Sequence, residues 1–385
     1  MRVVYICPSP TMYGDNKALM SIMPELVANG VEPIFVLQQY GDFSKYLSTA
    51  GYRYVVCKFT YNNIYNLSKP IVSYIKHFIK SAIWNLRKGR YLRNLINLLS
   101  EFKPQLVHTN NSANSFGLSL ARELNIPHVW HIREYMDLDH NKGFFPSKNA
   151  IERLFDHPLN TCIYITDDVS KHFNTHSKKI VIYDGIIEQS ENTFEPLNKD
   201  CNIIYVGRII ETKGVYDIIS AFTRVAKNIP NYQLTFIGDG ETAVKEKLQR
   251  MIIDSGISNR VNFLGYKTNI KDYMKHAKAI IVSSRFEAFG LITAEAMESG
   301  CLVIGRNTAG TKNQFDNGLF FTGNEIALRY DSLESLEESI VKAVTMPANE
   351  YNNMVSKAFD TVVNFYSVKK SASTVYSLYL NILNK

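Results

Sequence analysis

The sequence predicts an α/β protein of two doubly wound domains that face a central cleft. The chain has 385 residues, more than one hydrophobic core usually serves. Short apolar runs alternate with helical patterns, and this alternation is typical of parallel βαβ units. A polar stretch at 188–200 interrupts the alternation once, and the pattern then restarts. Two such units in succession favour a ligand site in a cleft between the domains.

Residues 1–186 are predicted to form the first domain. Helices are expected over 16–29, which Gly30 ends, and over 115–124, because apolar residues recur there at helical spacing. Strands are expected at the short apolar runs 3–6, 32–37, 54–57, 106–109, 129–131 and 162–165.

Residues 187–365 are predicted to form the second domain. Its expected strands are 203–206, 234–237, 261–264, 279–283 and 302–304. Its expected helices are 214–228, 242–254, 270–276 and 290–299. The chain from 332 onward is helical in pattern with no further strand, and a last helix at about 366–385 could pack back on the first domain.

Composition indicates a cytoplasmic protein. The five cysteines are scattered singly without a CxxC pair, which argues against a disulfide framework or structural zinc and fits a reducing compartment. The apolar start of the chain is too short for a signal peptide. No stretch approaches the roughly 18 apolar residues of a membrane span.

The formal net charge of +7 is concentrated in one segment. Between Asp42 and Glu101 there is no acidic residue, and within 60–100 cations are mixed with Tyr61, Tyr74, Trp84 and other aromatics. The segment fits an anionic membrane surface, on which the protein would be peripheral, or an ordinary amphipathic helix on the first domain. Both interpretations stay open. Nucleic acid is not expected, because no nucleic-acid module is recognisable.

The most informative motif begins where the strand 279–283 ends. Glu287 lies in the following loop, and Gly290 opens a helix that contains Glu295. The free amides and dipole of such a helix end favour an anion such as a diphosphate, while the two carboxylates could accept hydrogen bonds from sugar hydroxyls. Glu298 is expected on a solvated face.

A second motif follows the strand 203–206. Gly207 and Arg208 precede Lys213 and a helix, so that a guanidinium and an ammonium group could neutralise a leaving diphosphate. The loops containing Gly238 and Tyr266 also follow strands and suit packing against a nucleobase.

These residues stand in the order and spacing of family 4 retaining glycosyltransferases, which the second half resembles throughout and the first half more loosely. The motifs are Gly207-Arg208 with Lys213-Gly214, Gly238-Asp239-Gly240, Phe263-Leu264-Gly265, and Glu287 with Glu295. The resemblance implies the GT-B fold of two Rossmann-like domains, retention of anomeric configuration, and no metal or other cofactor.

The resemblance also implies residue roles. Arg208 and Lys213 would bind the donor diphosphate, Glu287 the donor sugar and Glu295 the ribose. The backbone amides of Phe289, Gly290 and Leu291 would lie near the phosphates and the sugar.

The first half matches that family less closely. Only Gly14 matches the family's Gly-Gly loop after the first strand, and His131 is the candidate for binding the transferred sugar. Asn110-Asn111 and Asp184-Gly185 end other strands and could line the cleft. At 308–311 the family's Gly-Gly is replaced by a loop that could shape the choice of donor sugar.

The sequence therefore predicts a transferase that moves a sugar from a nucleoside-diphosphate sugar to a glycan or polyprenyl-linked glycan in cell-surface polysaccharide synthesis. Glu287, His131, Arg208 and Lys213 are its expected catalytic set. A nucleotide-sugar 2-epimerase and a non-catalytic partner subunit of the same fold remain alternatives.

Overall fold

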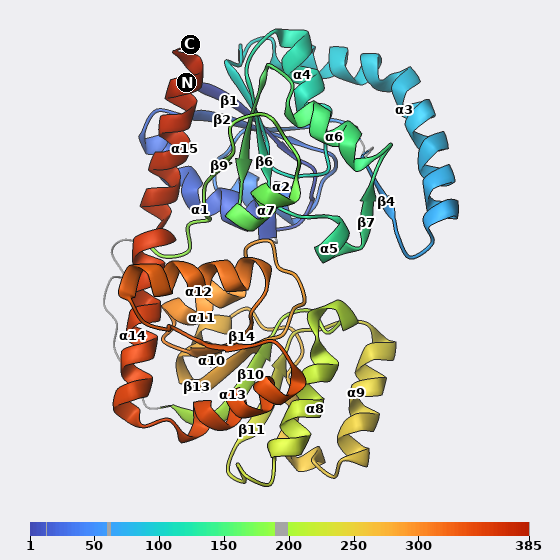
Figure 1. Cartoon of the computed structure of the whole chain (residues 1–385). Coiled ribbons are helices and arrows are strands. Elements are labelled where there is room, and N and C mark those ends of the chain that lie inside the picture. The colour runs from blue at the N-terminus through green and yellow to red at the C-terminus, as the bar shows by residue number, and fades with distance from the viewer. Residues whose placement is uncertain (13, 60–62, 189–198, 385) are drawn as a thin grey trace. The chain divides into compact units, whose positions relative to one another are not determined.

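The computed structural model describes residues 1–12, 14–59, 63–188 and 199–384. The chain forms two compact units (Figure 1). The N-terminal unit comprises Met1–Gly185 together with Val368–Lys385, and the C-terminal unit comprises Ile186–Ser367. Most of the polar stretch that separates the two predicted domains, 189–198, lies outside the described residues.

The N-terminal unit contains a parallel sheet in the order β3-β2-β1-β5-β6-β8-β9. Its strands are β1 (Arg2–Cys7), β2 (Glu32–Leu37), β3 (Tyr54–Val56), β5 (Leu106–Thr109), β6 (His128–Ile132), β8 (Asn160–Tyr164) and β9 (Ile180–Val181). Each predicted strand of this half is found. The two-residue β9 was not predicted, because a run that short has no readable period.

Helices cover both faces of this sheet. They are α1 (Gly14–Ala28), α2 (Asp42–Thr49), α3 (Pro70–Leu99), α4 (Phe116–Leu124), α5 (Asp137–His140), α6 (Lys148–Phe155), α7 (Asp167–His172) and α15 (Val368–Leu383). On one face Tyr5 and Phe35 pack with Leu19 of α1 and Tyr379 of α15. On the other face Val4 packs with side chains of α3 and α4. Side chains of α15 thus form part of the core of the N-terminal unit.

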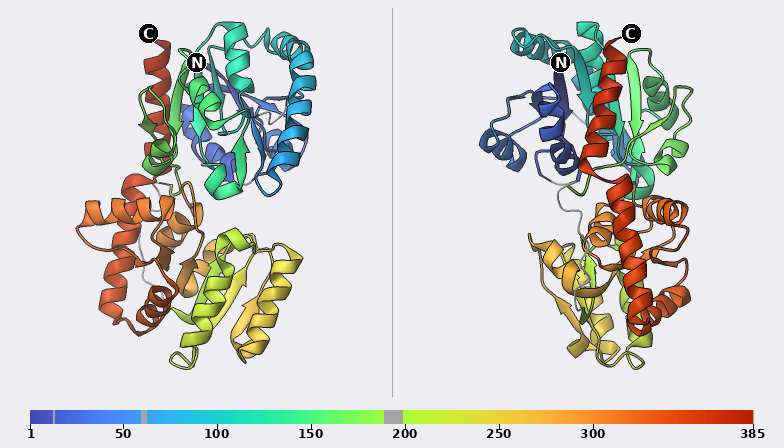
Figure 2. Two further views of the ribbon diagram at one scale, coloured as in Figure 1. Left: turned by 45° about the vertical axis from the view of Figure 1, so that its right-hand side comes forward. Right: turned by 90° about the vertical axis from the view of Figure 1, so that its left-hand side faces the viewer.

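One feature of this unit was not predicted, and another, a helix within 60–100, was one of the two open interpretations of that segment. A short antiparallel pair is formed by β4 (Ile64–Asn66) and β7 (Lys142–Phe144). Helix α3 is 30 residues long and runs along the outside of the unit (Figure 1, Figure 2). Its buried residues include Ser81, Trp84, Leu92, Leu95 and Leu99, and much of its first half is exposed.

The C-terminal unit contains a second parallel sheet, in the order β12-β11-β10-β13-β14-β15. Its strands are β10 (Asp200–Val206), β11 (Gln233–Ile237), β12 (Val261–Phe263), β13 (Ala277–Val282), β14 (Leu302–Arg306) and β15 (Leu328–Tyr330). The α/β class with a parallel sheet in each of two domains is therefore confirmed. The three-residue β15 was not predicted.

The helices of the C-terminal unit follow the strands in alternation. They are α8 (Val215–Val225), α9 (Thr242–Asp254), α10 (Ile270–His276), α11 (Leu291–Glu298), α12 (Ala309–Thr322), α13 (Leu333–Thr345) and α14 (Ala348–Phe365), with short 3-10 turns η2 (Glu211–Lys213) and η3 (Ser258–Arg260). A core of strand side chains such as Ile203 and Ile281 packs against Phe222 of α8, Leu248 of α9 and Leu336 of α13.

Candidate functional site

The sheet order of the C-terminal unit reverses between β10 and β13, which are hydrogen-bonded neighbours. At such a switch point the loops after the two strands diverge and leave a crevice at the carboxyl edge, where doubly wound folds bind ligands. The two predicted motifs occupy these two loops. The Ser283 hydroxyl donates to the Lys213 carbonyl oxygen at 2.6 Å, and the Arg285 amide donates to the Thr212 carbonyl oxygen at 3.4 Å.

Gly214 allows the two loops to approach this closely. Its φ is +68°, and a Cβ atom added there would lie 2.3 Å from the Ser283 carbonyl oxygen. A larger residue would be strained in conformation and would also push the loops apart.

An ion pair joins the two motifs directly. Lys213 Nζ lies 2.5 Å from Glu287 Oε1, with the two side chains 29% and 24% exposed. A charge-assisted hydrogen bond of this kind restricts both side chains. The structure thus brings together the residue expected to bind diphosphate and the residue expected to bind the sugar.

Arg208 precedes Lys213 in the same loop, and it is exposed. The buried Tyr205 hydroxyl donates to the Arg208 carbonyl oxygen at 2.7 Å and so holds this turn of backbone. Burial raises the pKa of Tyr205, the charge of Glu287 raises it further, and that of Arg208 opposes both. Sequence reasoning missed Tyr205, because a tyrosine in a buried strand looks like any other core residue.

Helix α11 begins directly after Gly290 and contains Glu295. Glu295 is buried, and its carbonyl oxygen accepts a hydrogen bond from the Ser299 hydroxyl. The prediction for Glu298 is wrong, since its side chain is only 7% exposed and pairs with Lys271 at 2.8 Å. The face of α11 that carries Glu298 therefore contacts Lys271 of α10 and is not solvated.

The segment 308–311, predicted as a loop, is instead the start of α12. Glycine and threonine are weak helix formers, so the pattern favoured a loop, but tertiary contacts hold the first turn. The Gly310 amide donates to the Glu287 carbonyl oxygen at 2.7 Å, and Gln314 Nε2 donates to the Phe289 carbonyl oxygen at 2.6 Å. Helix α12 therefore braces the loop that carries Glu287.

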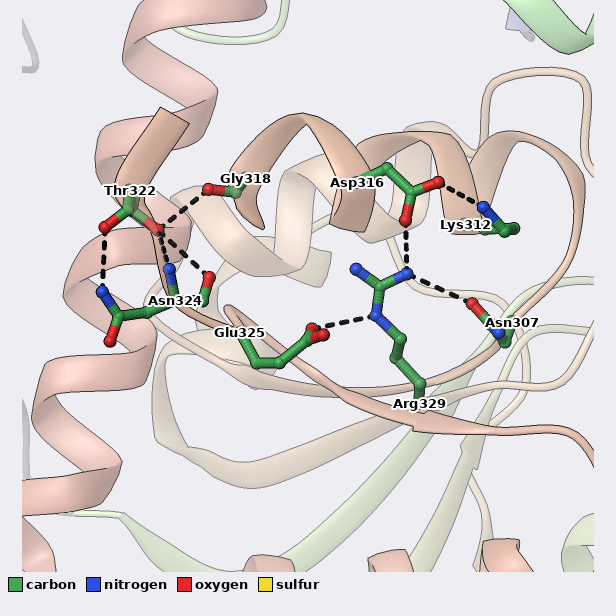
Figure 3. A network of polar contacts seen from close by, with 8 residues as sticks. All are labelled: Asn307, Lys312, Asp316, Gly318, Thr322, Asn324, Glu325 and Arg329. Atoms are coloured by element: carbon green, nitrogen blue, oxygen red, sulfur yellow. Dashed lines mark hydrogen bonds and ion pairs between the residues drawn. The ribbon is translucent and has the colours of Figure 1, made fainter. Parts of the chain in front are cut away.

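The outer side of α12 is anchored by the polar network of Figure 3. Arg329 of β15 donates to Asp316 of α12 at 2.6 Å, to Glu325 at 2.9 Å and to Asn307 at 3.2 Å. Burial opposes ionisation of Asp316, but hydrogen bonds from Lys312 and Arg329 outweigh it and lower the pKa of that carboxyl. The network ties α12 to the end of the sheet.

A cavity of about 410 Å³ lies at the carboxyl edge of β10, β11 and β12. Its lining includes Ile209, Gly238, Asp239, Phe263 and Gly265. Gly238 and Gly265 come from the two loops predicted to pack against a nucleobase. Tyr266, predicted for the same role, is 61% exposed and is not among the lining residues.

The N-terminal unit has its own switch point, between β1 and β5. Gly14, the predicted donor contact, is exposed at the first residue of α1. Asn110, which follows β5, is buried, and its side-chain amide donates to the Asp15 carbonyl oxygen at 2.9 Å.

His131 is buried in β6, with its ring 5.6 Å from that of His108. Burial, with help from the positive charge of Arg133, lowers its pKa well below the ordinary range, so the imidazole is neutral. Its Nε2 atom has no hydrogen-bond partner. This side chain therefore retains an unused donor or acceptor.

The sequence analysis did not predict the cluster of charged side chains near His131. Both terminal nitrogens of the buried Arg133 donate to Asp184 Oδ1, at 2.9 and 2.6 Å. Burial, reinforced by the charge of Glu134, raises the pKa of Asp15 to about 7, against the opposing effect of Arg133. The spacing of these charged residues in the sequence does not predict the cluster, because they come from segments that are far apart in the chain and meet only in the fold.

Within the four described ranges, no group of three or more His, Cys, Asp or Glu side chains is arranged to hold a metal ion. No described helix is both long and apolar enough to cross a membrane.

Known proteins resemble this chain in sequence and in fold. Residues 187–361 match the family described as "Glycosyl transferases group 1". A relative named uncharacterized glycosyltransferase, from Methanocaldococcus jannaschii, is 24% identical over 246 residues, which are 58% of this chain and 60% of that protein. The alpha-monoglucosyldiacylglycerol synthase of Acholeplasma laidlawii is 24% identical over 345 residues, 80% of this chain and 82% of the relative.

A solved structure extends the similarity to the fold of the whole chain. HepE of Anabaena, crystallised with UDP-glucose, aligns with a TM-score of 0.77 at 17% identity, over 99% of this chain and 100% of that one. The similarity confirms the predicted fold class.

Proposed function

We propose that this protein, whose residues 187–361 match the family of group 1 glycosyl transferases, transfers a sugar from a nucleoside-diphosphate sugar to a hydroxyl group of a glycan or lipid-linked glycan in polysaccharide or glycolipid synthesis. The observation that carries the proposal is the Lys213–Glu287 pair at the switch point of the C-terminal sheet, beside the exposed Arg208. Two cations and a carboxylate at one sheet edge suit a diphosphate joined to a sugar.

In this proposal the cations act on the leaving group. Arg208 and Lys213 bind the diphosphate and stabilise the charge that develops as the bond to the sugar breaks. Glu287 accepts hydrogen bonds from the donor sugar, and Glu295 from the ribose. The base packs in the cavity lined by Gly238 and Gly265. The reaction needs no metal and retains the anomeric configuration.

The N-terminal unit recognises the acceptor in the same proposal. Its neutral His131 offers the unpaired Nε2 atom as a hydrogen-bond partner for the transferred sugar. The carboxyl groups of Asp15 and Glu134 lie in the same region of the unit, and in this proposal they accept hydrogen bonds from acceptor hydroxyls in addition to those from the protein backbone.

We also propose that α3 rests on an anionic membrane surface. One face of the helix exposes Ile71, Ile75, Phe78, Ile79 and Leu86. Tyr74 and Trp84, expected at the headgroup level, instead point inward, where the Tyr74 ring lies 5.1 Å from that of Phe145 and Trp84 is buried. Tyr61 lies outside the described residues. An apolar stripe on a basic helix suits an interfacial position, and absence of co-sedimentation with anionic vesicles at low salt would remove this part of the proposal.

A thermal-shift panel of nucleoside diphosphates and their sugar conjugates, with and without EDTA, tests the main proposal. A ligand at 100 times its dissociation constant should add about 2.7 kcal/mol to the stability. We expect one base to be selected, with no effect of EDTA. No shift with any nucleotide would favour a non-catalytic partner subunit. Isomerised free sugar released without an acceptor would favour a 2-epimerase.

A further inference from the structure

A large cavity lies under α3, within the N-terminal unit. Its volume is about 1040 Å³, and it is bounded by α3, by the chain just after β2 and β3, and by the β4–β7 pair. That volume is at the upper end for a small-molecule site, so it has room for more than a single phosphate group.

The described cavity lining is rich in positive charge and contains no carboxylate. The cations that line it are Lys58, Lys69, Lys76, Lys80, Arg87 and Lys142. No ion pair within the described ranges involves any of these cations. Like charges gathered in one concavity raise the local potential and attract an anion.

Three of these cations form a stripe on α3. Lys76, Lys80 and Arg87 follow one another at intervals of four and seven residues, which return to one face of a helix, and Lys69 directly precedes the first residue of α3. The exposed apolar residues Ile71, Ile75 and Phe78 fall on a different face. The stripe therefore turns toward the cavity and not toward the surface proposed to meet a membrane.

Two further polar groups in the same cavity lack hydrogen-bond partners. Ser81 is only 8% exposed, lines the cavity, and its hydroxyl has no hydrogen-bond partner. The Nε2 atom of His77, another lining residue, is buried without a partner. Buried polar groups usually have partners, so these two point to a ligand with hydrogen-bonding groups.

Aromatic side chains form the rest of the wall. Phe59, Tyr65, Trp84 and Tyr91 line the cavity, and the rings of Trp84 and Tyr91 stack at 5.2 Å. Such surfaces can cover the apolar face of a sugar or lipid, while the cations bind its charged groups.

We propose that this cavity binds the phosphate-bearing part of the acceptor. The inference rests on the proposed transferase function and adds the chemical class of its acceptor: a glycan or lipid-linked glycan that carries phosphate monoester, diester or diphosphate groups. All the described residues that line the cavity belong to the N-terminal unit, and none of them is among the residues assigned above to the donor diphosphate, sugar or base.

Binding of inorganic diphosphate tests the charge recognition. The parent protein should carry Arg208→Ala and Lys213→Ala, so that the donor site does not compete for the diphosphate. We expect binding that weakens with salt, and a further loss of about tenfold or more on adding Lys76→Ala and Lys80→Ala, because two charged partners are removed. The matched control adds Arg90→Ala and Arg93→Ala, which remove the same charge from α3 without touching the cavity lining. Equal losses in the two double variants, or no binding to the parent, would overturn the proposal.

Two acceptor probes then distinguish the source of the phosphate. One is a soluble glycerol-phosphate oligomer, and the other is a polyprenyl diphosphate in phosphatidylcholine vesicles. If the Lys76/Lys80 variant loses binding to one of these probes and the Arg90/Arg93 variant keeps it, the result supports acceptor binding in the cavity, and the probe affected identifies the source of the phosphate. Phosphatidylglycerol vesicles without acceptor serve as a third probe. If the protein binds only to these vesicles, and both double variants lose that binding equally, the cations serve membrane adsorption and the proposal is wrong.

The donor site provides an independent readout. The Lys76/Lys80 changes, made without those at Arg208 and Lys213, should leave the nucleotide thermal shift unchanged. A protein without any nucleotide shift would contradict the transferase function itself, whatever the behaviour of the cavity.

Discussion

At the scale of single residues, the site depends on pairs that the fold brings together. Lys213 and Glu287 are 74 positions apart and meet because β10 and β13 are neighbours in the sheet. Each could be found from the sequence, since each follows a strand and precedes a helix. Tyr205 and Gln314, which hydrogen-bond to the backbone of the two site loops, could not, because a side chain that binds a backbone carbonyl oxygen leaves no pattern in the sequence.

Replacing Glu287 by Gln should separate binding from chemistry. The amide keeps the size of the side chain but loses the charge that pairs with Lys213 and accepts sugar hydroxyls. We expect folding and nucleotide affinity to be retained and transfer to fall by about 10²-fold or more. Steady-state transfer rates beside nucleotide titrations provide the measurement, and near-normal turnover would mean that Glu287 does not contact the donor sugar.

The carboxyl of Asp15 should make stability depend on pH. Its pKa is raised to about 7 by burial and by Glu134, whereas the unfolded chain has the ordinary value near 3.8. The folded state therefore holds more protons between about pH 4 and 7, and stability falls as the pH rises through that window. The Asp15→Asn variant has no carboxyl group at this position, so its stability should fall less between about pH 4 and 7. Chemical denaturation at pH 5 and pH 7.5 measures it, with the exposed Asp42→Asn as control. Identical pH slopes for wild type and Asp15→Asn would contradict the assignment.

At the scale of elements, strands that stand out as apolar runs were predictable, including the three-residue β3 and β12, whereas several other short strands were not. The runs 32–37 and 106–109 match β2 and β5, because the buried part of a parallel strand appears as a run of mainly apolar residues. The three-residue strands β4, β7 and β15 do not stand out as apolar runs in the sequence, and each is paired with a neighbouring strand in the structure. The start of α12 was missed for a similar reason, since contacts outside the helix hold it.

Gly310→Ala should disturb the donor loop through this helix. A Cβ atom there would lie 2.6 to 2.7 Å from the carbonyl oxygens of Glu287, Ala288 and Phe289. The loop must shift, so we expect transfer to fall at least tenfold with a modest loss of stability. Gly89→Ala is the control, because nothing lies within 4 Å of its added Cβ atom. Wild-type activity in Gly310→Ala would show that α12 does not position the loop.

At the scale of the whole molecule, the chain's last helix belongs to the unit that its first residues build. Tyr379 of α15 lies 2.5 Å from His108 Nδ1 and 3.2 Å from the Tyr5 hydroxyl, in the core of the N-terminal unit. The sequence shows a helical pattern near 366–385 but not this contact, because a buried tyrosine has no signal that names its partner.

Tyr379→Phe should therefore weaken the N-terminal unit. Removing the hydroxyl leaves His108 and Tyr5 without that partner, and an unpaired buried polar group costs roughly 1–3 kcal/mol. Urea unfolding should show a lower midpoint, while nucleotide binding to the C-terminal unit stays unchanged. An unchanged midpoint would mean that this contact contributes nothing measurable to stability.

The central claim is that the C-terminal unit holds a nucleoside diphosphate at the switch point between β10 and β13. Calorimetric titration of the nucleoside diphosphate selected by thermal shift tests it most directly, on wild type, Arg208→Ala and the exposed control Arg250→Ala. Loss of a charged hydrogen-bonding partner is worth about 1.5–3 kcal/mol, so Arg208→Ala should bind at least tenfold more weakly. The control should stay within about twofold of wild type, because Arg250 is not expected to contact the nucleotide. Equal affinity of wild type and Arg208→Ala would contradict the assignment of this site.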